Sequence, residues 1–290
     1  MGYNTARLAI ENVVKNSLVN IEDNPERSLR NLVDMALQFA KDNSQRAFFR
    51  NIQKMLFDEN SGYYILFKDV IQNVDKGRLQ RFGINLGYNG CILGINKIKK
   101  YIRENKIKKP WIMNIDTDKN ISNYDKFIEE GENNGIYIWS VITSRDKVSD
   151  LKMAARHKES AFIIFVNGKD MTEKFIESAL EVDNIMIVIS YDEAAEDISN
   201  ILRKNKILYS VYYEYKKEDC KKIKDGEMIE KIQMLHPLFT FFIASENIDQ
   251  NTKEDIYKYI FKARCEQIYN TILFDLYGDL NNINSRVYLG

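Results

Sequence analysis

The spacing of apolar residues changes near position 109 of the chain. Before it, apolar residues recur every three or four positions, which is the spacing of one face of an amphipathic helix. After it, short apolar runs alternate with amphipathic stretches, as in strands joined by helices. The pattern predicts a helical N-terminal region at 1–105 and an alternating strand and helix region at 106–290. In the first region, the predicted helices lie at 24–43, 44–59 and 62–74.

The second region contains a series of predicted strands with helices between them. The strands lie at 111–116, 136–142, 161–167, 185–190, 208–215 and 238–245, with a candidate seventh strand at 271–277. The helices lie at 122–134, 147–159, 171–182, 193–205, 227–235 and 251–270. Apolar strands joined by helical crossovers form parallel sheets that are covered by helices. The predicted fold class is therefore α/β, a partial (β/α)6 TIM-like barrel preceded by a helical N-terminal region.

Four glycines, Gly83, Gly87, Gly90 and Gly94, recur at three- and four-residue spacing within segment 82–102. In a helix they would form a smooth stripe against which another part of the chain packs closely. A phosphate-binding loop is the alternative, but it would require a preceding strand and a following Gly-Lys-Ser/Thr motif. The sequence has neither, so close packing is the prediction.

Composition limits the classes of partner. Acidic and basic residues balance at 42 each, so no overall positive field attracts nucleic acid. No apolar run approaches the roughly 20 residues of a membrane-spanning helix. The first residues do not resemble a secretory signal, and we expect a cytoplasmic protein. Cys91, Cys220 and Cys265 lack the spacing of metal ligands, so we predict no metal and no cofactor.

A series of short motifs along almost the whole chain resembles the radical S-adenosylmethionine (radical SAM) enzymes. The motifs are FGIN with a following ILG, PWIMNID as the first strand, EEGENNGIYIW, IFVNG and VIS. Their order and spacing, rather than any one motif, resemble a clostridial-type group in this family. The resemblance implies a six-unit partial barrel after a helical N-terminal region, and it implies activity on peptides.

The two motifs that carry the chemistry of that family are absent from this sequence. Its members place a CxxxCxxC loop after the first strand, where three thiolates hold an iron–sulfur cluster. Here Asp116 is followed by TDKNISNYDKF, which contains no cysteine. A GGE-type turn that receives the SAM amino group is replaced by TSRD at 143–146. The resemblance therefore implies a degenerate member that does not cleave SAM.

Polar residues follow the predicted strands at the edge where α/β barrels hold their active sites. The candidate ligand-binding residues are Asp116, Asp118, Thr143, Ser144, Arg145, Asn167, Ser190, Asp192, Glu214 and Glu246. Several converging carboxylates could bind a divalent cation or shift one another's pKa. Helix capping is the favoured interpretation for Asp116, Asp146 and Asp192. Arg145 is a hypothetical anchor for an anionic group such as a peptide carboxylate.

Two further residue groups have an ordinary structural interpretation. His157 lies near a predicted helix end, where histidines usually contact terminal carbonyls or solvent. Tyr209, Val211, Tyr213 and Tyr215 alternate along one predicted strand and therefore share a face. That face is either core or the wall of a ligand groove.

Three functions remain open from the sequence. The leading hypothesis is a non-catalytic radical SAM-like protein that binds a peptide or protein partner, by analogy within a peptide-maturation system. The alternative is a metal-dependent hydrolase or isomerase, which requires at least three carboxylates among Asp116, Asp118, Asp192, Glu214 and Glu246 to converge. A structural homo-oligomer is the third.

Overall fold

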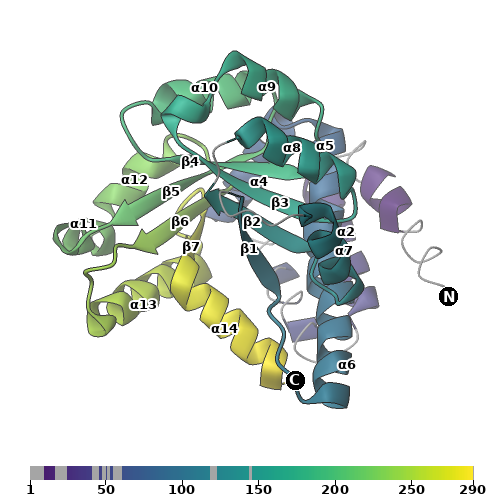
Figure 1. Ribbon diagram of the computed structural model, residues 1–290. Coiled ribbons are helices and arrows are strands. Elements are labelled where there is room, and N and C mark those ends of the chain that lie inside the picture. The colour runs from purple at the N-terminus through teal and green to yellow at the C-terminus, as the bar shows by residue number, and fades with distance from the viewer. Residues whose placement is uncertain are drawn as a thin grey trace.

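The computed structural model describes residues 10–16, 25–40, 46–47, 50, 53–54, 61–117, 123–143 and 146–289. These residues form a parallel sheet of seven strands in the order β1 to β7, with helices on its outer side (Figure 1). The predicted α/β half-barrel with a helical N-terminal region is confirmed. The candidate seventh strand joins the sheet, which therefore has one strand more than the six-unit barrel predicted.

The N-terminal helices begin where short polar side chains cap them. Ser61 accepts a hydrogen bond from the backbone N–H of Tyr64, and Asp75 accepts one from Arg78. The helical elements are α2 (Pro25–Phe39), α4 (Gly62–Asn73), α5 (Lys76–Gly83), the π-helical segment η1 (Ile84–Gly94) and α6 (Ile95–Asn105). The helices predicted at 24–43 and 62–74 are confirmed. The helix predicted at 44–59 lies mostly outside the described residues, and the division into domains at 105/106 stays a prediction.

Each strand pairs in parallel with the next, through a helical crossover. The strands are β1 (Ile112–Asp116), β2 (Ile138–Thr143), β3 (Ala161–Val166), β4 (Ile185–Ser190), β5 (Tyr209–Tyr215), β6 (Phe239–Ala244) and β7 (Ile272–Asp275). The helices that follow them are α7 (Tyr124–Asn133), α8 (Lys147–Arg156), η2 (Gly168–Asp170), α9 (Glu173–Leu180), α10 (Ala195–Lys204), η3 (Lys217–Asp219), α11 (Cys220–Lys224), α12 (Glu227–Gln233), α13 (Gln250–Glu266) and α14 (Leu276–Leu289).

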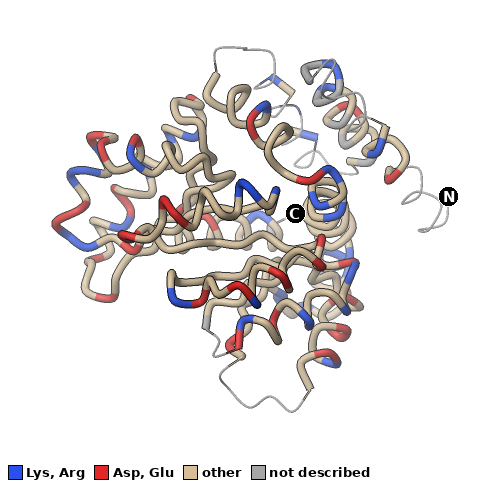
Figure 2. The backbone as a smooth tube through the Cα atoms, turned by 90° about the horizontal axis from the view of Figure 1, so that it is seen from above, with Lys and Arg blue, Asp and Glu red and all other residues tan. Residues whose placement is uncertain are grey.

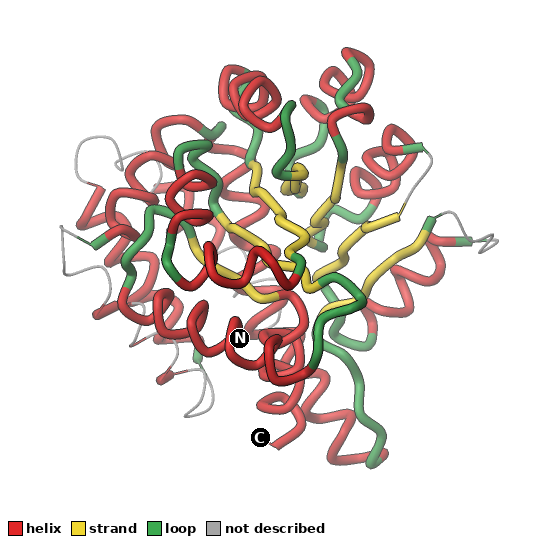
Figure 3. The backbone as a smooth tube through the Cα atoms, turned by 90° about the vertical axis from the view of Figure 1, so that its left-hand side faces the viewer, coloured by secondary structure: helices red, strands yellow, loops and turns green. Residues whose placement is uncertain are grey.

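Helices surround the curved sheet (Figure 3). Apolar residues of its strands alternate between two packed clusters, one on each face. On the outer face, residues such as Phe162 and Ile164 pack against helices α7 to α13. On the inner face, Ile163 and Phe165 belong to a cluster that includes Leu66 of α4. Tyr209, Val211 and Tyr215 are buried in the outer layer, so the tyrosine face of β5 is core.

Side chains from α5 and η1 hold the N-terminal ends of the strands. Arg78 donates to the carbonyl oxygens of Ala179 and Val182 at 2.9 and 2.6 Å, just before β4. Asn85 donates to the carbonyl oxygens of Lys158 and Ser160, both at 2.9 Å, just before β3. The N-terminal region therefore closes this end of the half-barrel through hydrogen bonds to main-chain carbonyls.

Two of the four glycines of the predicted stripe are sites of close packing. A Cβ on Gly90 would overlap the side chain of Ile138, and one on Gly94 would overlap the carbonyl oxygen of Gly135. Gly83 and Gly87 have open space at the same position. The packing prediction is confirmed for Gly90 and Gly94 and is wrong for Gly83 and Gly87.

Helix α14 lies over the open side of the half-barrel, between its two edge strands. It begins directly after β7 and contacts α6 and β6 (Figure 1). Near its other end, Asn284 accepts a hydrogen bond from the backbone N–H of Trp111 at the start of β1, at 3.2 Å. The candidate strand at 271–277 is confirmed as β7, but it ends at Asp275, and the helix that follows it was not predicted.

Charged residues of both signs are interspersed over the described chain (Figure 2). None of the described helices combines the length and the apolar composition needed to cross a bilayer.

Candidate functional site

The candidate residues whose side chains are described lie at the C-terminal ends of β1, β3, β4, β5 and β6. Asp116 ends β1, Asn167 follows β3, Ser190 ends β4, Glu214 is the penultimate residue of β5, and Glu246 follows β6. The strands are parallel, so these positions share one edge of the sheet. Thr143 ends β2, but its side chain lies outside the described part, as do Asp118, Ser144 and Arg145. The hypothesis on Arg145 therefore stays a prediction.

Tyr212 brings two of these candidates together. Its hydroxyl donates a hydrogen bond to Asn167 Oδ1 at 2.8 Å, and the nearby Ser190 side chain acts to lower its pKa. Tyr212 and Ser190 are paired positions in the β4–β5 ladder. Its ring packs on Phe165 of the inner face, with the ring centres 5.5 Å apart. We call Asn167, Ser190, Tyr212 and Glu214 the Tyr212 cluster.

The surroundings of the Tyr212 hydroxyl are partly buried and negatively charged. Burial raises the pKa of Tyr212, and the charges of Asp192, Glu214 and Asp170 raise it further, against the effect of the Ser190 side chain. Tyr212 therefore stays a neutral phenol at neutral pH, able both to donate and to accept a hydrogen bond. Asn167 and Glu214 are exposed, so the Tyr212 cluster is open to solvent.

The helix-capping prediction is confirmed for Asp146 and is wrong for Asp192, because the N-cap of α10 is Ala194 and it has no side-chain capping bond. Asp146 caps α8 by accepting from the backbone N–H of Ser149 at 3.1 Å. Asp192 accepts from the backbone N–H of Ala194 at 2.9 Å, in the turn before α10. The cap of α7 is Asn123 rather than Asp116, which lies at an irregularity of the β1–β2 ladder. The prediction for Asp116 is therefore wrong.

The donor set needed for a metal ion is not found among the described residues: no group of three or more His, Cys, Asp or Glu side chains there could hold one. Asp192 serves a backbone N–H, and Glu246 is exposed beyond the end of β6. Asp118, the remaining carboxylate of the metal hypothesis, lies outside the described residues.

The comparisons with known proteins give weak structural likenesses. No protein-family model and no curated protein matches the sequence. The crystal structure of Streptococcus suis SuiB bound to S-adenosylmethionine aligns over 62% of this chain with 11% identity and a TM-score of 0.48. A second crystal structure of Streptococcus suis SuiB aligns over 81% with 10% identity and a TM-score of 0.45. Membership of the radical SAM family stays a prediction.

Only part of each SuiB chain is aligned with this protein. The alignments cover 50% and 55% of the two SuiB chains, so this chain spans about half the length of the proteins it is similar to. The function proposed below therefore rests on the residues of this chain.

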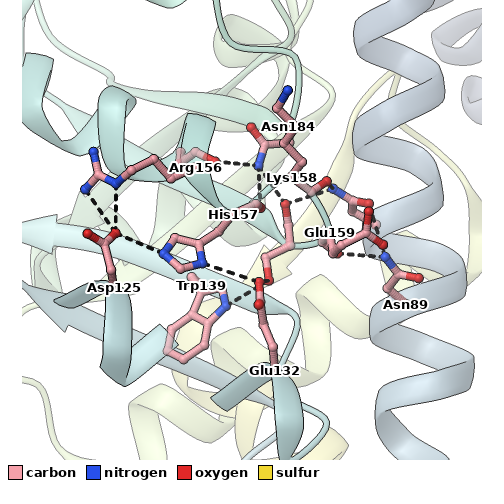
Figure 4. A network of polar contacts seen from close by, with 12 residues as sticks. Asn89, Asp125, Glu132, Trp139, Arg156, His157, Lys158, Glu159 and Asn184 are labelled. Carbon is pink, nitrogen blue, oxygen red and sulfur yellow. Dashed lines mark hydrogen bonds and ion pairs between the residues drawn. The ribbon is translucent and has the colours of Figure 1, made fainter. Parts of the chain in front are cut away.

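A second polar network lies at the opposite, N-terminal ends of the strands (Figure 4). The His157 ring is almost fully buried, with Nε2 3.0 Å from Asp125 Oδ1 and Nδ1 3.8 Å from Glu132 Oε1. Arg156 also contacts Asp125, at 3.0 Å. Asn184 lies beside this group, with its Nδ2 within 3.0 Å of the carbonyl oxygens of Ala154, His157 and Ser160 (Figure 4).

The sequence interpretation of His157 was incomplete. Its backbone does end α8, as predicted, but its ring bridges two carboxylates of α7. Burial alone would lower the pKa of His157, but the hydrogen bonds and charges of Glu132 and Asp125 outweigh it and raise the pKa. The pKa of Asp125 is lowered, chiefly by the hydrogen bond from Arg156 and also by the hydrogen bond and charge of His157. His157 therefore ties α7 to the end of α8, and its two carboxylate contacts favour the protonated ring.

Sequence reasoning also missed two groups at the C-terminal ends of the strands. Tyr212 was not among the predicted site residues. Its position two residues before Glu214 is the signal that could have found it, because alternate residues of a strand share a face. Asp275 ends β7 and is buried, with a pKa raised to about 6 by burial. It was overlooked because the sequence predicted a strand running through it.

Proposed function

We propose that this chain is a non-catalytic, radical SAM-like protein that binds a peptide or protein partner at the Tyr212 cluster. The observation that carries the proposal is the Tyr212 hydroxyl bonded to Asn167, beside Ser190 in the β4–β5 ladder and with its ring packed on Phe165, at the solvent-open ends of the strands. In α/β barrels this edge of the sheet is where ligands are bound.

The chemistry of the cluster suits recognition of a polypeptide. A tyrosine supplies a large contact area and a hydrogen-bonding group at a low cost in conformational entropy, which makes it common in binding surfaces. Asn167 supplies an amide and Ser190 a hydroxyl, which complement main-chain N–H and C=O groups. The charges of Asp170, Asp192 and Glu214 favour a partner that presents a basic side chain here.

The absence of the family's reactive motifs from the sequence supports a binding role rather than SAM cleavage. The loop after β1 contains no cysteine to hold a cluster. A fold that lacks its reactive centre can still serve recognition. The peptide-maturation setting comes from the sequence resemblance by analogy. The metal-dependent hydrolase is less favoured, because Asp192 serves a backbone N–H and Glu214 lies beside Tyr212.

Native mass spectrometry tests the proposal. The protein is purified without oxygen, alone and after co-expression with the products of adjacent genes. We expect a stoichiometric complex with a peptide or protein. Tyr212→Phe removes one hydrogen-bonding group and should weaken the complex by about 1 kcal/mol, or about fivefold in Kd.

Tyr213→Phe is the matched control, since it removes a hydroxyl from the opposite face of the same strand and should leave binding unchanged. Equal binding by wild type, Tyr212→Phe and Glu214→Gln would exclude the Tyr212 cluster as the site. A stoichiometric divalent metal on the isolated chain would favour the hydrolase, and an iron–sulfur cluster with SAM cleavage would contradict the non-catalytic role.

A further inference from the structure

The junction between β7 and α14 encloses two carboxylates within one helical turn. Asp275 and Asp279 are each only 4% exposed. Asp275 Oδ1 accepts from the backbone N–H of Gly278 at 2.6 Å, and the backbone N–H of Asp275 donates to Asp279 Oδ2 at 2.9 Å. These reciprocal bonds fix the start of α14 at the end of the strand.

The guanidinium of Arg264 lies beside this pair of carboxylates and bonds Asp279. Both terminal nitrogens of Arg264 donate to Asp279, at 2.6 and 2.8 Å, and one also donates to the carbonyl oxygen of Leu273 at 3.0 Å. Arg264 therefore neutralises Asp279 and ties α13 to β7 and α14. Asp275 receives a backbone N–H instead, so its negative charge would lie buried beside a second carboxylate.

The groups around Asp275 come from several elements. Burial and the charge of Asp279 raise the pKa of Asp275, to about 6. The hydrogen bond from the Gly278 N–H and the charges of Arg264 and Lys253 of α13 act in the opposite direction. Tyr215 of β5 faces it from the sheet, and its own pKa is raised by burial and by Asp275. Tyr257 of α13 and Tyr63 of α4 adjoin the Arg264 and Asp279 pair.

Helix α14 is the element that these contacts hold over the open side of the half-barrel. Its first residue, Leu276, packs in the inner apolar cluster. Its far end is held by other contacts: Val287 is buried, Asn284 accepts from the backbone N–H of Trp111 at 3.2 Å, and Lys108 lies over the ring of Tyr288. The buried carboxylates at the first turn are the contacts of α14 whose strength depends on protonation.

We propose that the β7–α14 junction is a pH-sensitive latch, in which α14 stays packed over the open side while Asp275 is protonated and loosens when Asp275 ionises beside Asp279. The direction follows from proton linkage. The packed form binds the Asp275 proton more tightly than the released form, whose carboxyl has the ordinary value of 3.8. Packing is strongest below that value and weakens as the pH rises through about 6.

Hydrogen–deuterium exchange of the full chain, corrected for intrinsic exchange rates, measures the latch without any partner. Peptides from 276–289 should lose protection between about pH 4.5 and 7, by about 25-fold if α14 opens as a unit. Peptides from α9 serve as the internal reference, because they lie away from the junction and should change little.

Asp275→Asn keeps an oxygen acceptor for Gly278 but cannot ionise, so α14 should stay equally protected at both pH values. The matched control is Asp249→Asn, which alters the exposed cap of α13 and should keep the wild-type response. Unchanged protection of α14 in the wild type, or a drop that persists in Asp275→Asn, would overturn the latch. Should the variant not fold, carboxyl-carbon NMR of the wild type decides: Asp275 titrating near its ordinary value also overturns it.

Discussion

The two ends of the parallel strands are built differently. At the N-terminal ends, buried side chains donate to main-chain carbonyls that precede the strands, as Arg78, Asn85 and Asn184 do. At the C-terminal ends of β3, β4 and β5, the polar side chains of the Tyr212 cluster are partly or fully exposed, and Tyr212 bonds a side chain instead. Buried polar groups must be satisfied within the fold, whereas exposed ones are available to a ligand. The N-terminal ends therefore serve stability, and the Tyr212 cluster at the C-terminal ends is open to the ligand that we propose.

Among the changes proposed here, removal of Arg78 should cause the largest loss of stability. Arg78→Ala leaves the carbonyl oxygens of Ala179, Leu180 and Val182 without their buried donor. We expect the free energy of unfolding to fall by about 3 kcal/mol, measured by urea denaturation. Arg103→Ala, on the exposed side of α6, is the control and should change it by less than about 0.5 kcal/mol. Equal losses in the two variants would contradict the role given to Arg78.

A pair of glycine substitutions in η1 tests the packing of the N-terminal region against the sheet. Gly94→Ala places a methyl group against the carbonyl oxygens of Gly135 and Asn89, which are backbone atoms that cannot move aside freely. It should cost about 2 kcal/mol in thermal or urea unfolding. Gly87→Ala meets open space and should be neutral or stabilising by up to about 1 kcal/mol. Similar results for both would show that the stripe does not pack as described.

The pH dependence of unfolding tests how much His157 contributes to stability at the N-terminal ends of the strands. His157 has a raised pKa in the folded protein, so its contribution to stability is full below the ordinary value of 6.5 and is lost as the pH rises through the folded value. His157→Gln should remove this decline above neutral pH. His236→Gln should retain it, since the His236 ring is half exposed. A decline that survives in His157→Gln must have another source.

The smallest effect is expected at the C-terminal ends. Tyr212→Phe removes a hydroxyl whose partner Asn167 is exposed and can bond water instead. The free energy of unfolding should change by less than about 0.5 kcal/mol, although partner binding weakens. A loss as large as that of Arg78→Ala would show that the Tyr212 cluster stabilises the fold rather than recognising a partner.

The strands were predictable because their apolar runs carry their own signal. β4 coincides with the predicted 185–190, and β5 and β6 differ from prediction by a residue or two at their ends. Because the strand ends were predicted closely, Asn167, Ser190 and Glu214 could be chosen as site candidates from the sequence. Tyr212 could have been found from alternation with Glu214, but its hydrogen bond to Asn167 could not, because the two residues come from different strands.

The sequence by itself determined the order of the elements, since the period of apolar residues reports which faces are buried. Tertiary structure alone decided α14: its sequence is rich in asparagine and interrupted by Gly278, yet Arg264 and the reciprocal bonds of Asp275 and Asp279 hold its first turn. It also decided the ionisation of His157 and Asp275. These depend on burial and on charges brought close in space, whose energies vary with distance and desolvation rather than with sequence position.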